Sequence, residues 1–140
     1  MARSLTPFLM FQGQDAEAAM RFYVSLFDGA RIVRLDRFPA GGAGPEGSVL
    51  HGEIEIAGQV VRFFDSPVKH AFGFTPSSSL FVDCSSADEL DRLFAALSDG
   101  GRVLMPPDNY GFSERFAWTD DRFGVSWQLD WRGETDATRT

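Results

Sequence analysis

The chain has 140 residues, of which 44% are hydrophobic, which suits one globular domain or two small modules that share a core. Its 20 acidic and 13 basic residues give a net charge of −7, which excludes the basic surface that nucleic acids and anionic membranes require of a partner. The chain lacks both a membrane-spanning apolar run and the apolar core of a signal peptide, so we expect a cytoplasmic protein that binds neither nucleic acid nor membrane.

The first half of the chain predicts a strand, a helix and three further strands. Residues 5–11 form the first strand, and a helix follows with Asp15 as its N-cap and Gly29 just past its end. One face of that helix is apolar, at Ala19, Phe22, Tyr23 and Leu26.

The helix is followed by a strand that begins after Gly29 and by a flexible loop at residues 39–47. Residues 49–56 then alternate in polarity. One face of this strand carries His51, Glu53 and Glu55, and the other carries Leu50, Ile54 and Ile56. A turn at Ala57-Gly58 leads into residues 59–65.

The same pattern returns 71 residues later without a gap. Ser86 is predicted to cap a second helix, with Glu89 completing a capping box, and Asp99-Gly100 repeats Asp28-Gly29. The apolar face returns at Leu90, Leu93, Phe94 and Leu97. The strands before and after each helix align at the same offset, so the chain contains an internal repeat.

Each repeat is predicted to end in a hairpin. In the second, residues 115–118 and 125–128 flank a turn in which Gly124 is free to adopt positive φ. Two helices for about eight strands are too few for a parallel doubly wound sheet, so we predict an α+β fold of two βαβββ modules. The predicted divisions are a first module at 1–65, a linker at 66–77, a second module at 78–131 and a disordered tail at 132–140. Residues 105–111 are predicted as a loop, and the exposed edges of two curled sheets favour a homodimer.

From Thr6-Pro7-Phe8-Leu9-Met10-Phe11 to Gln128-Leu129, the chain resembles the PhnB-like branch of the vicinal oxygen chelate superfamily, relatives of glyoxalase and the bleomycin-resistance proteins. The segments that carry the resemblance are Ala19-Met20-Arg21-Phe22-Tyr23, Ser77-Ser78-Ser79-Leu80-Phe81-Val82, and the closing hairpin Asp121-Arg122-Phe123-Gly124-Val125-Ser126-Trp127. The resemblance implies mixed sheets that curl around a cleft, usually within a homodimer. Members are often labelled demethylubiquinone methyltransferases. Here the glycine cluster at 41–44 is followed by Pro45 and a strand, not by a helix that holds a nucleotide, so we do not expect that activity.

The resemblance also implies where a metal would be held. Enzymes of the superfamily hold a divalent metal with one side chain from the first and one from the last strand of each module. The corresponding positions here are Phe8 (or Thr6 if the register slips by one pair), Ser79, Gln128, and Phe63 or a neighbour, with Asp65 the nearest carboxylate. Phenylalanine cannot ligate a metal, and serine and glutamine are weak ligands. We therefore expect no metal at the ordinary site and no cofactor.

Strand alternation predicts what the cleft contains. Trp127 and Leu129 should pack under the helices, which leaves Gln128 facing the cleft. The same alternation adds four residues to that surface, Phe8, Met10, Ser79 and Phe81, and the resulting pocket is aromatic and apolar with a few polar groups. Three further residues are predicted to contact a ligand, Tyr110 and Trp118 by stacking and Arg115 by its charge. The alternatives are ordinary core aromatics and an exposed strand arginine.

His51 shares a strand face with Glu53, so the two could act as acid–base partners or as half of a relocated metal site. The alternative is an ordinary hydrogen-bonded histidine. His70 lies in the predicted linker and is expected at the surface, and Cys84 is expected to be a buried, inert thiol.

Two functions remain. One is a metal-independent small-molecule binder of the sequestering or resistance kind. The other is a metal-dependent lyase, isomerase or dioxygenase that uses unconventional ligands such as His51, Glu53 and Gln128. The missing ligands at the ordinary metal site favour the binder.

Overall fold

The computed structural model describes residues 1–133 and divides into two compact units, each described by itself. Unit 1 is Met1–Gly73, and unit 2 begins at Phe74. Of the tail predicted at 132–140, residues 134–140 lie outside the described residues. None of the helices in the described part of the chain is long and apolar enough to cross a membrane.

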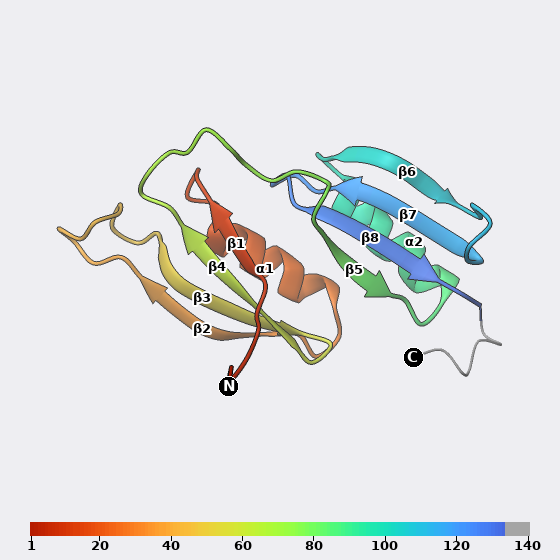
Figure 1. The fold of residues 1–140 in the computed structure, drawn as a ribbon, viewed down its shortest axis with the longest axis horizontal. Helices are drawn as coiled ribbons and strands as arrows, with labels where there is room; N and C mark the ends of the chain where they lie inside the picture. The colour runs from red at the N-terminus through yellow and green to blue at the C-terminus, as the bar shows by residue number, and fades with distance from the viewer. Residues whose placement is uncertain (134–140) are drawn as a thin grey trace. The chain divides into compact units, whose positions relative to one another are not determined.

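Each unit is a four-stranded mixed sheet with one helix (Figure 1). Unit 1 contains β1 (Phe8–Phe11), α1 (Ala16–Leu26), β2 (Arg31–Arg37), β3 (Val49–Ile56) and β4 (Gln59–Asp65), in the sheet order β1-β4-β3-β2. Unit 2 contains β5 (Ser79–Asp83), α2 (Ala87–Ser98), β6 (Arg102–Asp108), β7 (Arg115–Asp120) and β8 (Ser126–Trp131), in the order β5-β8-β7-β6. The predicted α+β fold of two βαβββ modules is confirmed.

The internal repeat is present in the structure. β5, α2 and β6 begin at residues 79, 87 and 102, each 71 residues after the starts of β1, α1 and β2 at 8, 16 and 31. In both sheets the first strand pairs in parallel with the last, and the remaining pairs are antiparallel. The glycines that follow the two helices, Gly29 and Gly100, both have φ of +75°. Each lies in the tight turn after its helix, in which the N–H of Ala30 or Gly101 donates to the carbonyl oxygen of Phe27 or Ser98. Glycine adopts positive φ there at low steric cost.

Each helix covers one face of its own sheet, and the core of the unit lies between them. In unit 1, Met20 and Tyr23 of α1 are fully buried, and the Tyr23 ring lies 5.9 Å from that of Phe63 on β4. In unit 2, the buried apolar face of α2 consists of Leu90, Leu93 and Leu97. The opposite face of each sheet has no helix of its own unit on it, and we call it the helix-free face.

The helix caps differ from the sequence prediction in their partners. Asp15 is the N-cap of α1, but its side chain makes no capping hydrogen bond. Instead, the N–H of Ala16 donates to the buried Asp65 carboxylate at 3.0 Å, from 49 residues away. Ser86 caps α2 as predicted by accepting from the N–H of Glu89, whereas the Glu89 carboxylate accepts from the N–H of Ser85 rather than that of Ser86.

Two strand predictions are wrong in detail. Leu50 is exposed, because a register shift between Asp36 and Arg37 makes it an extra residue opposite β2, and Val49 is buried in its place. The loop predicted at 105–111 begins later, because β6 continues to Asp108 through two prolines. β6 is an edge strand, where a missing N–H costs no ladder hydrogen bond.

Candidate functional site

The helix-free face of unit 2 carries most of the predicted ligand-binding residues. Trp127 and Leu129 are buried on the helix side, as predicted, and Gln128 lies on the helix-free face. Gln128 pairs across the strands with Phe81 on β5 and with Trp118 on β7. Residues paired in this way present their side chains on the same face. Phe81 is 53% exposed, so this face offers a large apolar surface beside an amide group.

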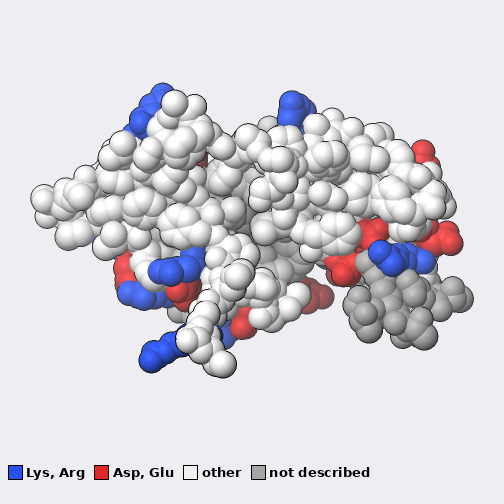
Figure 2. All heavy atoms as spheres, viewed as in Figure 1, with Lys and Arg blue, Asp and Glu red and all other residues white. Residues whose placement is uncertain are grey.

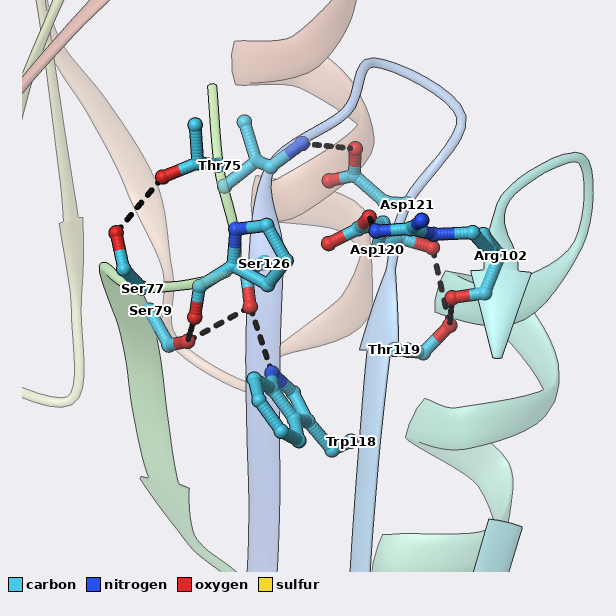
Figure 3. A network of polar contacts seen from close by, with 11 residues as sticks. Thr75, Ser77, Ser79, Arg102, Trp118, Thr119, Asp120, Asp121 and Ser126 are labelled. Carbon is cyan, nitrogen blue, oxygen red and sulfur yellow. Dashed lines mark hydrogen bonds and ion pairs between the residues drawn. The ribbon is translucent and has the colours of Figure 1, made fainter. Parts of the chain in front are cut away.

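A hydrogen-bonded network continues this face (Figure 3). The indole Nε1 of Trp118 donates to Oγ of Ser126 at 2.8 Å, and Oγ of Ser126 lies 2.7 Å from Oγ of Ser79. Ser126 is buried and Ser79 is half-buried, so the network runs from the interior toward the surface. The hydrogen bond holds the Trp118 ring in one orientation. A fixed aromatic plane next to hydroxyl and amide groups is typical of small-molecule sites.

Two other predicted binding residues make contacts outside this network. Phe116 and Trp118 lie on one face of β7, and Arg115 lies on the other, which is the helix side. There its Nε is 2.7 Å from a carboxylate oxygen of Asp91 on α2. Tyr110 stacks on Phe112 and meets the edge of Phe116, and its hydroxyl donates to the carbonyl oxygen of Pro106. Tyr110 therefore belongs to an aromatic cluster with Phe112 and Phe116, and Phe116 shares its face of β7 with Trp118.

In unit 1, His51 and Glu53 lie together, as their shared strand face predicts. His51 Nε2 is 2.8 Å from Oε2 of Glu53, and the Arg62 guanidinium lies against the same ring, with Nη2 3.1 Å from Nδ1 and 3.0 Å from Nε2. The geometry fits an Nε2–H that donates to the carboxylate and an Nδ1 that accepts from Arg62. Arg62 was not among the predicted site residues. It could have been found, because a two-residue turn at Ala57-Gly58 places Glu53 opposite Arg62.

The apolar part of the same face comes from β1 and β4. Phe8 pairs with Arg62 and Met10 pairs with Phe64, and the rings of Phe8 and Phe64 are 6.1 Å apart. Phe8 is 55% exposed. Phe8 and Met10 correspond to Ser79 and Phe81, as predicted, because they are the first and third residues of the first strand of each unit.

The position in unit 1 that corresponds to Gln128, predicted as Phe63 or a neighbour, is the neighbour Phe64. Phe64 pairs with Met10 as Gln128 pairs with Phe81, whereas Phe63 is buried against α1. Asp65, the nearest carboxylate, is buried and accepts hydrogen bonds from the N–H groups of Ala16 at 3.0 Å and Val49 at 2.8 Å. Its two oxygens fasten α1 and β3 to β4, which is a structural role.

Among the described residues, no group of three or more His, Cys, Asp or Glu side chains is placed to hold a metal ion. Cys84 is buried, and burial, followed by the nearby charge of Glu89, raises the pKa of its thiol to about 12. His70 stacks on Phe72 in the segment that follows β4, and its backbone N–H donates to the side-chain carbonyl oxygen of Gln12.

A shallow depression of about 370 Å³ lies elsewhere in unit 2, and none of the predicted site residues lines it. Its lining is Asn109, Gly111, Phe112, Ser113, Glu114 and Arg132. The depression is open and largely polar, unlike the apolar concave sites that bind small molecules. On the face drawn in Figure 2, charged side chains form small separate groups of both signs rather than an extended basic patch.

The fold and the helix-free faces define a protein of the vicinal oxygen chelate type, and the comparisons with known proteins agree. The model of the 3-demethylubiquinone-9 3-methyltransferase family matches residues 3–130, so the chain belongs to that family, in its PhnB-like branch. A search of the curated proteins found no match.

Solved structures support this assignment. The chain is 46% identical to a putative 3-demethylubiquinone-9 3-methyltransferase, PhnB protein, from Bacillus cereus, with a TM-score of 0.88 over 92% of this chain and 99% of that one. It is 25% identical to protein PA1353 from Pseudomonas aeruginosa, with a TM-score of 0.77 over 94% and 98% of the two chains. An oxidase, ChaP-H2, is 19% identical with a TM-score of 0.55 over 96% and 98%, which shows a shared fold alone.

Proposed function

We propose that the protein binds a small organic molecule on the helix-free faces of its sheets and does so without a metal ion. One observation carries the proposal. Where the first and last strands of each unit lie side by side, the central positions of the helix-free face are Phe8, Met10, Arg62, Phe64, Ser79, Phe81, Ser126 and Gln128. These residues combine aromatic and apolar surface with a few hydrogen-bonding groups, which suits binding, and their side chains are poor ligands for divalent metals.

The alternative is a metal-dependent lyase, isomerase or dioxygenase that uses His51 and Glu53. Their 2.8 Å contact favours this alternative, because an imidazole and a carboxylate are common metal ligands. Against it, the Arg62 guanidinium lies within 3.1 Å of both ring nitrogens of His51. A fixed positive charge at that distance opposes a divalent cation.

We do not propose the methyltransferase activity that the family's label names. The loops that join β1 to α1 and β5 to α2 contain one glycine, Gly13, so neither has the glycine-rich turn that cradles a nucleotide at a helix N-terminus. The glycine cluster at residues 41–44 lies between β2 and β3.

The test combines elemental analysis with a binding assay. Protein purified without chelator should contain far less than one equivalent of zinc, nickel, manganese or iron per chain. A panel of flat aromatic compounds should include ligands that quench tryptophan fluorescence, because Trp118 lies next to Gln128 on the helix-free face, with Phe81 on the other side of Gln128. Phe81→Ala should weaken such a ligand by about fivefold, from the loss of one aromatic contact.

A matched control is Phe72→Ala, which removes an exposed aromatic ring from the segment that follows β4. It should leave the affinity unchanged. One equivalent of metal per chain would favour the enzyme instead, and a panel without any ligand would contradict the binding proposal. We also propose that the protein is a homodimer, since each sheet has two edge strands, and a monomer mass in light scattering would contradict this.

A further inference from the structure

Arg62 lies at the border between two kinds of surface on the helix-free face of unit 1. On the β1 side are Phe8 and Met10, with Phe64 beside them on β4. On the β3 side are His51 and Glu53, in contact with the guanidinium. A ligand that covers the apolar side therefore brings one end of itself to Arg62.

The guanidinium is held in place before any ligand arrives. Its Nη2 is 3.1 and 3.0 Å from the two ring nitrogens of His51, and its Nε is 3.7 Å from Oε2 of Glu53. Nε itself is buried without a hydrogen-bond partner, while the side chain as a whole is 41% exposed. A pre-positioned arginine loses little side-chain freedom when it binds a ligand.

Arg62 also keeps much of its charge available. The Glu53 carboxylate is beyond hydrogen-bond distance of Nε, and its Oε2 already accepts from His51. Arg34, a cross-strand neighbour of Glu53, differs in this respect, because its Nε lies 2.6 Å from Oδ2 of Asp36. Of these two arginines, Arg34 has its charge matched by a carboxylate at hydrogen-bond distance, whereas the Arg62–Glu53 contact is longer, at 3.7 Å.

We propose that Arg62 anchors the anionic group of the ligand, and that the ligand is a small organic anion whose flat apolar body rests on Phe8 and Phe64. This inference rests on the proposed function and adds the chemical class of the ligand. A planar guanidinium matches a carboxylate or a similar oxyanion with paired, charge-assisted hydrogen bonds. The neighbouring aromatic rings favour a flat body.

Two fluorescent probes with the same aromatic body test the inference. 1-Anilinonaphthalene-8-sulfonate carries a sulfonate, and N-phenyl-1-naphthylamine is its neutral counterpart. The wild-type protein should bind the anionic probe about tenfold more tightly, and Arg62→Gln should remove that preference while leaving the neutral probe within about twofold. Arg34→Gln is the matched control, with the same change of charge on the same face, and it should keep the preference.

Two further measurements keep the test decisive. Arg62→Lys retains the charge without the planar guanidinium, so it should keep part of the preference for the anionic probe. Circular dichroism would reveal whether Arg62→Gln perturbs the fold, and in that case Arg62→Lys still tests the role of the charge. The chain has two histidines, and the anionic probe should shift the ring NMR signals of His51 and leave those of His70 unchanged.

The inference is overturned if both probes bind equally, if Arg62→Gln keeps the preference, if Arg34→Gln loses as much, or if the His51 signals do not move. In those cases binding itself, and with it the proposed function, still stands. If neither probe binds and the aromatic panel also yields no ligand, the proposed function fails.

Discussion

Removing the Asp121 carboxylate should selectively destabilise the last hairpin. This side chain is 2% exposed, and its Oδ1 accepts from the N–H groups of Phe123 at 2.8 Å and Val125 at 3.1 Å. Its Oδ2 accepts from Nε1 of the buried Trp127 at 2.9 Å. One carboxylate thus fixes the turn and orients the largest buried side chain of the unit.

The magnitude follows from the bonds lost. Asp121→Asn keeps one oxygen but directs an NH2 group at a buried donor, which should cost about 1.5–3 kcal/mol. Asp121→Ala removes every acceptor and should cost about 3–5 kcal/mol. In a Trp127→Phe background the indole N–H is absent, so Asp121→Asn should cost about 1–2 kcal/mol less than in the wild type.

Urea denaturation followed by tryptophan fluorescence measures this effect directly. The three tryptophans of the chain, Trp118, Trp127 and Trp131, all lie in unit 2, so the signal reports on the unit that contains Asp121. The control is Asp99→Asn, an exposed aspartate at the end of α2, which should change the free energy of unfolding by less than about 0.5 kcal/mol. The reasoning is refuted if Asp121→Asn behaves like this control, or if its cost does not depend on the indole.

Three other predictions concern single side chains. A hydrogen bond from Arg37 lowers the pKa of Glu17 below its ordinary 4.5, so Glu17→Gln should reduce stability above about pH 4.5, and urea titrations at several pH values should show the difference disappear in stronger acid. Because burial raises the pKa of Cys84 to about 12, alkylation by iodoacetamide at pH 8 should be at least ~100-fold slower in the native than in the unfolded protein, and equal rates would contradict the buried position. Ala57 has φ of +51° before Gly58 at +82°, a turn that favours Asn-Gly, so Ala57→Asn should stabilise the protein by about 0.5–1 kcal/mol, and an unchanged or lower melting temperature would contradict this.

The features that the sequence predicted correctly depend on short-range periodicity. Trp127, Gln128 and Leu129 alternate across β8 without a bulge, so strand parity alone assigns their faces. The caps and stops of the two helices lie next to them in the chain, and the constant offset between halves supported each assignment with a second copy. These local signals were enough for the fold.

The sequence was less informative where a shift of one residue in strand register sets the face of a side chain, or where the partner of a side chain is distant in the chain. Phe63 and Phe64 are neighbours on opposite faces, so the sequence left the position open between them, and the register of β4 selects Phe64. The bulge that exposes Leu50 depends on β2, and the cap from Asp65 comes from the far end of the unit. The ion pair of Arg115 with Asp91 was not predicted either, because Asp91 lies on α2 and strand alternation says nothing about contacts with a helix.

The repeat also indicates how the two halves diverged after a duplication. By register, Arg62 and Ser126 occupy the same place in their units, as do Phe64 and Gln128. A duplicated segment starts with two identical surfaces, so one copy can keep a working surface while the other accumulates substitutions. Here the surface of unit 1 carries ionisable groups, and that of unit 2 carries hydroxyl and amide groups. The polypeptide thus carries two chemically different surfaces on one repeated scaffold, without a separate fold for either.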